Sequence, residues 1–479
     1  MRFGINRIAR RSRPTSITGV DPYGMAGRMN EYALNTKSSR TPLRRILGAP
    51  TALLLGTGVA IGSGIFRAPG VVAQGMPTWQ WMLIGWVLGA VIVLIQGLVS
   101  AELATRYPEA GGEYVYLREA YGDCVAFFFG WAYTIFVIGG GAATISLAFG
   151  DFACELVSTN AKWSGPIAAG LIIAVTIVNA LGLRAGAGAQ NALSILKILA
   201  ILGVAAIGIA YGAPTNDAPE DPAPTVAHID FGLFLAAALP VLWSYSGTTD
   251  VVKMAEEIKD ARRTLPRAII GSTLLVAVVY MTFNIGLMRV VDPADMAGIV
   301  FIPGVVLDQI FGETGRRAAL IVAMLACLGS LSSTVLATIR VTYALARDGL
   351  TFRFMAHVSK GQAPVPALLV VACFSVVLVL NRDFEGVLRI YFLASTVLFG
   401  LTYATLIIFR LRDREFPTNV FRCPFGMGLA AISILIQAAL AINIVYESPG
   451  DSIKTIGLLA ALAIAYLAWK RFMMQSDSP

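Results

Sequence analysis

The residues best placed to do chemistry lie in two glycine-interrupted apolar runs, 51–66 and 243–249. The first run contains Gly56, Gly58, Gly62 and Gly64, although each glycine inside a helix costs about 1 kcal/mol relative to alanine. Such runs predict helices that unwind part-way through a membrane. Unwinding frees main-chain N–H and C=O groups, which only a cavity or a ligand satisfies at that depth. Glycine suits such a place because it lets the backbone approach a ligand closely.

The two breaks together predict a site for a zwitterion. Amides at the start of the outer half of the first helix would bind a carboxylate, because a helix N-terminus attracts anions. Carbonyls near Ile61 and near Trp243 and Ser244 would attract an ammonium group. The predicted binding residues are Ile61, Ser63, Gly64, Ile65, Trp243, Ser244, Tyr245 and Gly247. The alternative is that the glycines only permit close helix packing, but a second, matching break favours ligand binding.

A third candidate is Lys197, a single cation inside the apolar run 189–212. Ionisable residues within membrane spans are functional by default. The alternative is that the side chain reaches back to the membrane surface, since it lies only ~12 Å into the span at ~1.5 Å per residue. If Lys197 instead faces the core, its ammonium would hold the first span to the eighth, near Ser330, Ser332 or Ser333.

The composition of the whole chain predicts the elements that position these residues. Of 479 residues, 56% are hydrophobic and 14% are charged, with a mean hydropathy of +0.71. These values exclude a disordered chain and a disulfide-rich module, and they argue strongly against a soluble enzyme. At about 20 apolar residues a span, we expect an all-α polytopic membrane protein with about twelve transmembrane helices. The expected spans are 46–74, 79–105, 121–150, 163–182, 189–212, 231–256, 266–289, 315–346, 365–380, 386–410, 427–446 and 453–470.

The positions of the breaks and of the charges predict how these spans are organised. Five spans separate the two breaks, so the second half enters the membrane from the opposite side, as in an inverted repeat. We expect a basic tail (1–45), a first repeat (46–212), a second repeat (231–410) and a final pair of spans (427–471). Basic residues fill the tail and the connection after the sixth span, whereas the loop 213–230 contains none. Both termini are therefore expected in the cytoplasm, with the chain integral to the plasma, or cell inner, membrane.

Several other functions lack support in the sequence. No two of the five cysteines form a CxxC pair, and both histidines, His228 and His357, lie in predicted loops. No zinc-protease, phosphate-loop or nucleophile-elbow motif is present. We expect no catalytic residue, no metal, no cofactor and no nucleic-acid partner. The basic tail has two interpretations, a transit peptide or a segment attracted to anionic lipid. A membrane sensor or scaffold remains a distant alternative.

Six motifs along the chain resemble the amino acid–polyamine–organocation (APC) superfamily, most closely its L-type amino acid transporter branch. They lie at 62–66, 108–116, 243–247, 261–268, 346–349 and 364–366. The resemblance implies a LeuT-type fold, with two inverted five-helix repeats and two C-terminal helices. It also implies a secondary transporter that moves amino acids or related amines by alternating access.

The resemblance refines the roles of particular residues. Lys197 matches a lysine that takes the place of a sodium ion in several sodium-independent members, which implies sodium-independent exchange or proton coupling, with Lys197 a candidate proton carrier. Trp243 stands where many relatives have phenylalanine, so it is a gate candidate, with packing in the scaffold as the alternative. Apart from the resemblance, Asp250 is a candidate for an inner gate because it faces Lys253; the alternative is a solvated helix end. Members with a glycoprotein partner have a cysteine between helices three and four, and Cys154 lies too near the helix end to match it, so we expect no disulfide-linked heavy chain. With no carboxylate expected in the pocket, neutral amino acids are the predicted substrates. The alternative is a cationic amino acid or polyamine antiporter.

Overall fold

The computed structural model describes residues 44–181, 183–212, 231–359, 363–381, 383–413 and 415–476. Apart from one isolated bridge between Leu47 and Ile258, every element in these residues is a helix. The predicted all-α polytopic fold is confirmed. The predicted basic tail lies outside the described residues except for Arg44 and Arg45, and so does the predicted acidic loop 213–230.

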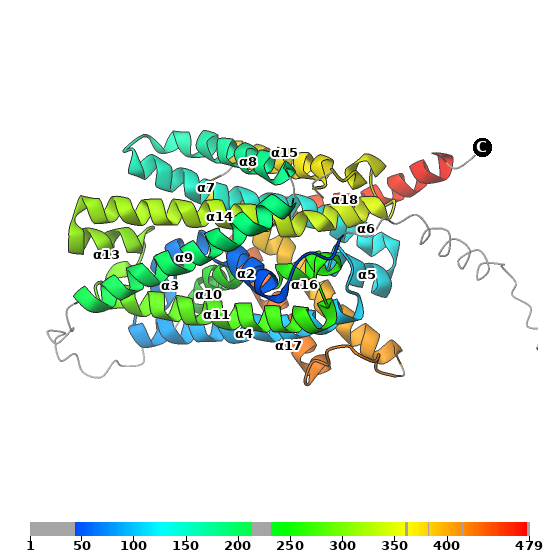
Figure 1. Ribbon diagram of the computed structural model, residues 1–479, viewed down its shortest axis with the longest axis horizontal. Helices are drawn as coiled ribbons and strands as arrows, with labels where there is room; N and C mark the ends of the chain where they lie inside the picture. The colour runs from blue at the N-terminus through cyan, green and yellow to red at the C-terminus, as the bar shows by residue number, and fades with distance from the viewer. Residues whose placement is uncertain are drawn as a thin grey trace, which may run out of the picture. The chain divides into compact units, whose positions relative to one another are not determined.

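The helices before this loop are drawn in blue to green in Figure 1. They are α2 (Ala49–Ala60), α3 (Gly64–Gly75), α4 (Trp79–Arg106), α5 (Glu113–Tyr121), α6 (Asp123–Ala132), η1 (Tyr133–Gly139), α7 (Gly140–Leu156), η2 (Ala161–Trp163), α8 (Ser164–Ala180) and α9 (Leu183–Tyr211). Of these, η1 is a π-helix that continues α6 into α7. A helix of this kind is often found at functional sites.

The helices after this loop run from green to red in Figure 1. They are α10 (Phe231–Tyr245), η3 (Asp250–Glu257), α11 (Ala261–Met288), α12 (Pro293–Met296), α13 (Ile302–Phe311), α14 (Glu313–Arg347), η4 (Arg353–Ala356), α15 (Val365–Asn381), α16 (Phe384–Arg412), α17 (Gly426–Glu447) and α18 (Pro449–Ser476). Three α-helices, α5, α12 and α13, lie where the sequence predicted loops.

Within the described residues, ten of the twelve predicted spans correspond to helices that are long and apolar enough to cross a membrane. Nine helices are long and apolar enough to cross a membrane, and the bent pair α2 and α3 adds a tenth. The other two predicted spans correspond to shorter helices: α15, with 17 residues, and α10, which is followed by η3.

The two predicted interruptions are present. Helix α2 ends at Ala60, and α3 starts at Gly64 after a bend of 48°. Helix α10 ends at Tyr245 and is followed by a turn in which Gly247 has a φ of +97°. A side chain is strained at this φ, and a Cβ at Gly247 would also collide with Val59 of α2. The two breaks therefore lie directly against each other inside the bundle.

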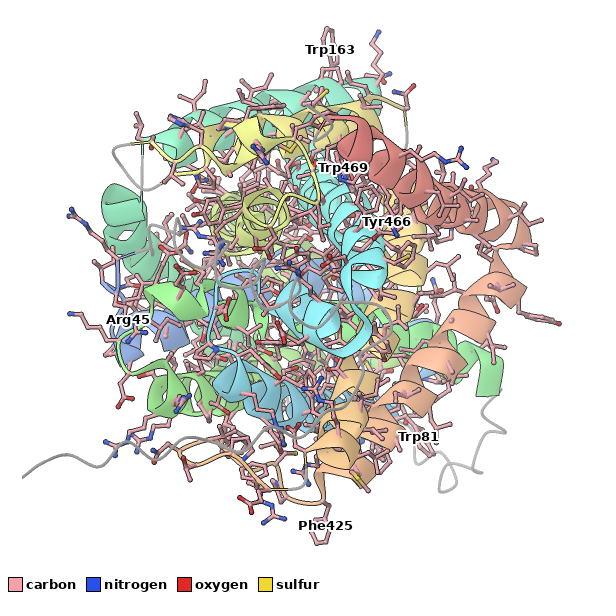
Figure 2. The ribbon with its side chains drawn as sticks, turned by 90° about the vertical axis from the view of Figure 1, so that its right-hand side faces the viewer. Arg45, Trp81, Trp163, Phe425, Tyr466 and Trp469 are labelled. Carbon is pink, nitrogen blue, oxygen red and sulfur yellow. The ribbon has the colours of Figure 1, made fainter. Side chains whose placement is uncertain are left out.

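The bundle surrounds these breaks with long helices and exposes apolar side chains at its surface. Helix α14 packs against α2, α7 and α9, while α11 packs against α2, α4 and α9. Figure 2 shows Trp163 and Phe425 projecting outward, where they are 51% and 87% exposed. By contrast, Glu102, Lys253 and Arg340 are buried. An apolar surface, with these charged side chains buried among an apolar core, suits a chain whose solvent is lipid.

The Leu47–Ile258 bridge and the Arg347–Glu256 ion pair bring the start of the described chain, the start of α11 and the end of α14 to one end of the bundle, here called the basic end. Its exposed arginines include Arg44, Arg45, Arg262, Arg263 and Arg353; Figure 2 labels Arg45. Ion pairs join the helices that meet there. Their N–O distances are 2.8 Å for Arg340–Glu257, 2.9 Å for Arg347–Glu256 and 2.6 Å for Arg118–Asp348. These pairs tie η3 and α5 to α14.

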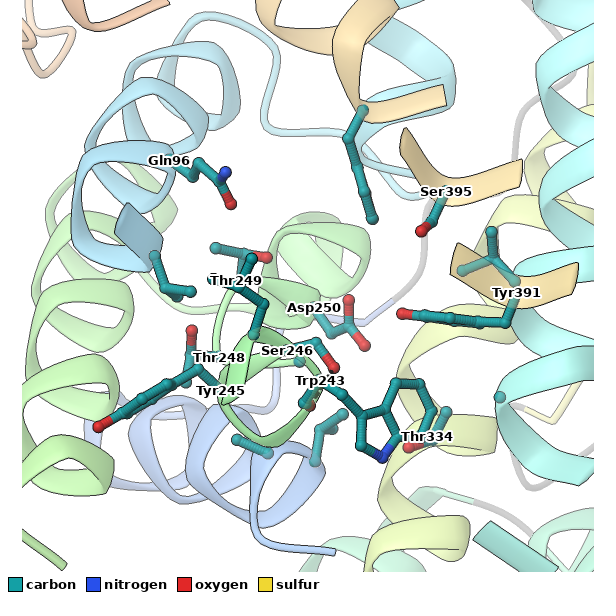
Figure 3. A pocket seen from close by; sticks show the side chains of 18 of the residues that line it. Gln96, Trp243, Tyr245, Ser246, Thr248, Thr249, Asp250, Thr334, Tyr391 and Ser395 are labelled. Carbon is teal, nitrogen blue, oxygen red and sulfur yellow. Dashed lines mark hydrogen bonds between the residues drawn. The ribbon is translucent and has the colours of Figure 1, made fainter. Parts of the chain in front are cut away.

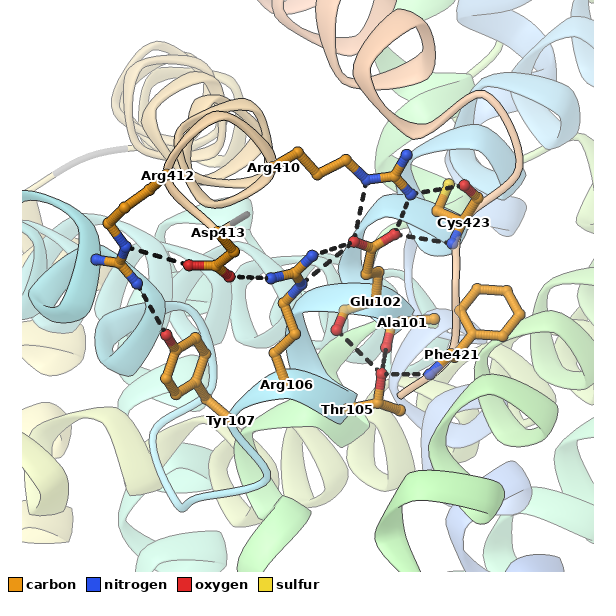
Figure 4. A network of polar contacts seen from close by, with 10 residues as sticks. All are labelled: Ala101, Glu102, Thr105, Arg106, Tyr107, Arg410, Arg412, Asp413, Phe421 and Cys423. Carbon is orange, nitrogen blue, oxygen red and sulfur yellow. Dashed lines mark hydrogen bonds and ion pairs between the residues drawn. The ribbon is translucent and has the colours of Figure 1, made fainter. Parts of the chain in front are cut away.

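A second polar network at the basic end is centred on the buried carboxylate of Glu102 (Figure 4). It accepts hydrogen bonds from Arg106 at 3.0 Å, from the guanidinium of Arg410, and from the Cys423 amide at 2.8 Å. Arg106 also donates to Asp413 at 2.6 Å. The network fixes α4 to α16 and to the segment before α17. Burial there raises the pKa of Cys423 to about 11, so its thiol stays protonated at neutral pH.

Candidate binding site between the broken helices

A cavity of about 110 Å³ lies between the two breaks (Figure 3). Its walls come from both breaks and from the helices around them, among them α4, α14 and α16. From the breaks they include Val59, Ala60, Gly62, Ser63, Gly64, Trp243, Tyr245, Ser246, Gly247 and Asp250. From α4, α14 and α16 they include Gln96, Ser330, Thr334, Tyr391 and Ser395.

The start of α3 gives this cavity a potential anion site. The first amides of a helix have no partner within the helix, and Ser63 makes no side-chain cap. The Ser63 hydroxyl is buried without a hydrogen-bond partner in the described part of the chain. A Cβ at Gly64 would lie 2.7 Å from the Ser244 Oγ and 2.9 Å from the Trp243 Cδ1. Glycine therefore lets α3 approach α10, and free amides with a hydroxyl suit a carboxylate.

The predicted binding residues divide into two groups in the structure. Five of them line the cavity: Ser63, Gly64, Trp243, Tyr245 and Gly247. The other three, Ile61, Ile65 and Ser244, are buried beside it and are not part of its lining.

Two carbonyls predicted to meet an ammonium group already accept hydrogen bonds from the protein. The Ile61 carbonyl accepts from Lys197 at 2.9 Å. The Tyr280 hydroxyl lies 2.9 Å from the carbonyl oxygens of both Ser244 and Ala60 and bridges the two broken helices. Sequence reasoning missed Tyr280, which lies in an ordinary apolar stretch of α11.

Lys197 is buried in the bundle and does not reach the membrane surface. Its side chain donates to the carbonyl of Gly58 at 2.6 Å and to that of Ile61 at 2.9 Å. A Cβ at Gly329 of α14 would lie 3.4 Å from the Lys197 Nζ. The ammonium thus occupies the junction of α2, α9 and α14, held by main-chain dipoles.

The three predicted serines of α14 face different neighbours. Ser330 donates to the Val59 carbonyl at 2.8 Å, and Ser333 accepts a hydrogen bond from the Gln190 amide. Both therefore lie on the side of α14 that faces α2 and α9. The Ser332 hydroxyl instead lies 3.5 Å from the Asn179 Nδ2 of α8.

Aromatic side chains close one side of the cavity. The ring of Trp243 packs edge-on against Tyr391, with 4.7 Å between centroids, and against Phe392 at 6.0 Å. Because Trp243 belongs to α10 and its two partners to α16, movement of either helix would open this contact. The gate role of Trp243 stays a prediction.

The expectation that no carboxylate lies in the pocket was wrong. Asp250 and Glu113 both line the cavity, and Figure 3 shows Asp250 and Tyr391 directed toward one another. The Lys253 ammonium lies 2.7 Å from the Asp250 Oδ1 and 2.9 Å from the Glu113 Oε1. Sequence reasoning missed Glu113 because it follows the second span in what read as a loop. The remaining carboxylates of η3 pair with Arg340 and Arg347.

Comparison with known proteins identifies the family of this chain. The family model described as "Amino acid permease" matches residues 47–468. The chain belongs to the amino acid permease family. This permease is thus an integral membrane protein and an amino acid transporter of the APC superfamily, and it is not an enzyme.

Individual relatives of the permease cover most of its length. It is 26% identical over 422 residues to the b(0,+)-type amino acid transporter 1 of Mus musculus, covering 87% of this chain and 85% of the relative. It is 27% identical over 310 residues to the serine/threonine exchanger SteT of Bacillus subtilis, covering 64% and 68% of the two chains. An uncharacterized transporter of Mycobacterium tuberculosis is 29% identical over 445 residues, covering 91% and 94%.

Proposed function

We propose that this permease carries a zwitterionic amino acid by alternating access, with the substrate held between the two broken helices. The observation that carries the proposal is the cavity bounded by both breaks, with the uncapped start of α3 on its wall. The substrate carboxylate binds the amides around Ser63 and Gly64, together with the unpartnered Ser63 hydroxyl. Discontinuous helices at the middle of an inverted repeat serve this purpose in secondary transporters.

The substrate ammonium binds at the end of α10. The last carbonyls of a helix have no partner within it, yet those of Leu242, Trp243 and Ser244 accept bonds from Ser246 or Tyr280. The next carbonyl along the chain belongs to Tyr245, which lines the cavity. We therefore assign the ammonium to the Tyr245 carbonyl, with the Asp250 carboxylate on the same wall.

Transport does not require sodium. The Lys197 ammonium occupies a cage of main-chain carbonyls between α2, α9 and α14. A sodium ion in the same cage would meet a like charge at bonding distance. Exchange is the favoured mode, because the relative from Bacillus subtilis is named an exchanger. Proton coupling through Lys197 is the alternative.

Neutral amino acids are the preferred substrates. The two carboxylates in the cavity are both bonded to Lys253, so the protein itself supplies their cation. One observation favours the alternative, a cationic amino acid or a polyamine. Two carboxylates face one ammonium, and the Glu113 Oε2 is buried without a partner in the described residues.

Two gates flank the substrate. Trp243 with Tyr391 closes one side, and Asp250 with Lys253 and Glu113 closes the side nearer the basic end. The basic end faces the cytoplasm because basic residues concentrate there. The permease then belongs in the plasma, or cell inner, membrane and works without a disulfide-linked heavy chain.

Counterflow into proteoliposomes tests the proposal. Vesicles containing the permease are loaded with serine, leucine, lysine or putrescine, and entry of the matching labelled solute is measured. We expect serine or leucine to give counterflow and putrescine to give none. Counterflow of lysine or putrescine alone would favour the alternative substrate class. The absence of counterflow for every amino acid tested would contradict the proposed function.

A matched set of analogues tests the two-ended grip. An amino acid, its decarboxylated amine and its deaminated acid are compared as competitors of uptake. The amine and the acid should each compete at least about 100-fold less well, because each leaves one buried polar end unpaired. If either analogue competed as well as the amino acid, the proposal that the broken helices bind both ends of the substrate would be contradicted.

A further inference from the structure

A second hollow lies at the basic end and is separate from the substrate cavity. Its volume is about 740 Å³. One wall is the first three turns of α11 with the residue before them, and the other is the segment before α17. The lining residues are Asp260, Arg262, Arg263, Pro266, Arg267, Ile270, Asn419, Val420 and Phe421.

This hollow has an excess of positive charge. Among its lining residues, three guanidinium groups face one carboxylate, which leaves an excess of two positive charges. Arg263 lies 3.8 Å from Asp260, but both side chains are well exposed, at 79% and 61%, so this pair is weak. Within the described residues, Arg262 and Arg267 have no ion-pair partner. In contrast, Arg340, Arg347 and Arg410 at the same end are all paired.

The start of α11 adds to this positive field. The helix has 28 residues and begins beside the hollow at Ala261. Asp260, which precedes it, has a φ of +46° and makes no side-chain cap. Free amides and the positive end of the helix dipole therefore join the three arginines. Such a surface suits a phosphate group, which guanidinium groups bind with charge-assisted hydrogen bonds.

The face of α11 that continues from the hollow is apolar. Leu274, Val278 and Ile285 follow Arg267 at spacings of seven, four and seven residues, which place all four on one helix face. These three apolar side chains are 51%, 63% and 39% exposed. A ligand that fits the whole surface has an anionic head at the arginines and an apolar tail along this face.

We infer that this hollow binds the headgroup of an anionic phospholipid, with its acyl chains along Leu274, Val278 and Ile285. A free phosphate ion shares the headgroup chemistry but has nothing to place on the apolar face. A basic pocket beside membrane helices at the cytoplasmic side is a known kind of headgroup site. The site would anchor the N-terminal end of α11, which packs on α2 and on η3 at the substrate cavity.

Native mass spectrometry of the full-length permease in neutral detergent tests this inference. The wild type is titrated with phosphatidylglycerol and, separately, with phosphatidylcholine. One variant combines Arg262→Gln, Arg263→Gln and Arg267→Gln. The matched control combines Arg44→Gln, Arg45→Gln and Arg353→Gln, which removes the same charge from the same end but outside the hollow. Thermal melting of both variants checks that they are folded.

We expect wild type and control to retain phosphatidylglycerol at least about tenfold more tightly than phosphatidylcholine, and the hollow variant to lose this preference. Equal retention of both lipids by the wild type would overturn the inference without any variant. If both variants lost the preference for phosphatidylglycerol equally, the preference would come from the general charge of the basic end, and the inference of a site in the hollow would be overturned. Displacement of the lipid by millimolar inorganic phosphate would assign the hollow to a free anion instead.

Discussion

Lys197 and Lys253 have nearly the same burial, at 2% and 0% exposure, but the protein holds their ammonium groups in different ways. Lys197 donates to two main-chain carbonyls of the first broken helix. Lys253 contacts two carboxylates, from η3 and α5, at 2.7 Å and 2.9 Å. One lysine is therefore bound by partial charges and the other by full charges.

The difference separates the two roles proposed for these cations, Lys197 in place of a bound ion and Lys253 in a gate. Carbonyl oxygens also suit a metal cation, and on this ground we proposed that Lys197 takes the place of one. The carboxylates at Lys253 repel each other once their cation is gone, so that cluster depends on the lysine. Replacing each lysine by an apolar side chain of similar length separates the two roles.

The largest effect is expected for Lys253→Met. Removing one partner of a buried ion cluster leaves uncompensated charge and costs about 3–5 kcal/mol of stability. We expect a clear fall in melting temperature in detergent, with loss of uptake. Lys259→Met, on the exposed residue just after η3, is the matched control and should melt like the wild type. A Lys253→Met protein as stable as this control would refute the cluster's role.

A smaller loss of stability is expected for Lys197→Met, about 1.5–3 kcal/mol, because hydrogen bonds from a charged group to neutral carbonyls are lost. Uptake should fall at least about tenfold, since α2 is no longer tied to α9 and α14. Melting temperature and uptake measured on the same preparation check this prediction. If Lys197→Met melted at or below the melting temperature of Lys253→Met, the carbonyl cage would contribute as much stability as the carboxylate cluster, and the difference proposed between them would be contradicted.

Close contact between the broken helices is tested by Gly64→Ala. The new Cβ would meet Ser244 and Trp243, and overpacking of this kind costs about 1–3 kcal/mol. We expect weaker apparent affinity for substrate, because the start of α3 moves away from the cavity. Gly170→Ala in α8 has no atom within 4 Å of its Cβ and serves as the control. Unchanged apparent affinity in Gly64→Ala would contradict the proposed carboxylate site.

The smallest effect separates two neighbouring serines of α14. Ser330→Ala removes a bond to the Val59 carbonyl and should cost about 1 kcal/mol. Ser332→Ala, whose hydroxyl lies on the side of α8, should stay within about 0.5 kcal/mol of the wild type. Chemical or thermal unfolding of the two variants in one detergent gives the comparison. A larger loss of stability for Ser332→Ala than for Ser330→Ala would contradict the packing of the Ser330 side of α14 against α2.

The sequence was sufficient to predict features whose signal is local. Glycines at 62 and 64 and the polar turn at 246–249 disrupt helices by their own backbone chemistry, so both breaks could be placed. Runs of apolar residues likewise predicted twelve spans. Within the described residues, ten of these spans are long and apolar enough to cross a membrane. The six motifs were enough to identify the family.

Features that depend on tertiary contact could not be predicted. Glu113, at the start of α5, lines the cavity, and nothing in the local sequence indicates this. The Tyr280 hydroxyl donates to the carbonyl oxygens of Ala60 and Ser244, which lie far from it in the sequence. Helix periodicity separates Ser332 from Ser330 and Ser333, but only the packing of α14 decides which side faces α2.

The central claim is that the protein's own lysine takes the place of a sodium ion. The most direct test is substrate uptake into proteoliposomes containing wild-type permease, with external sodium fully replaced by N-methylglucamine. We expect the same uptake rate, within about twofold, in both media, because less than about 0.4 kcal/mol of coupling would then depend on sodium. A strict requirement for sodium would contradict it.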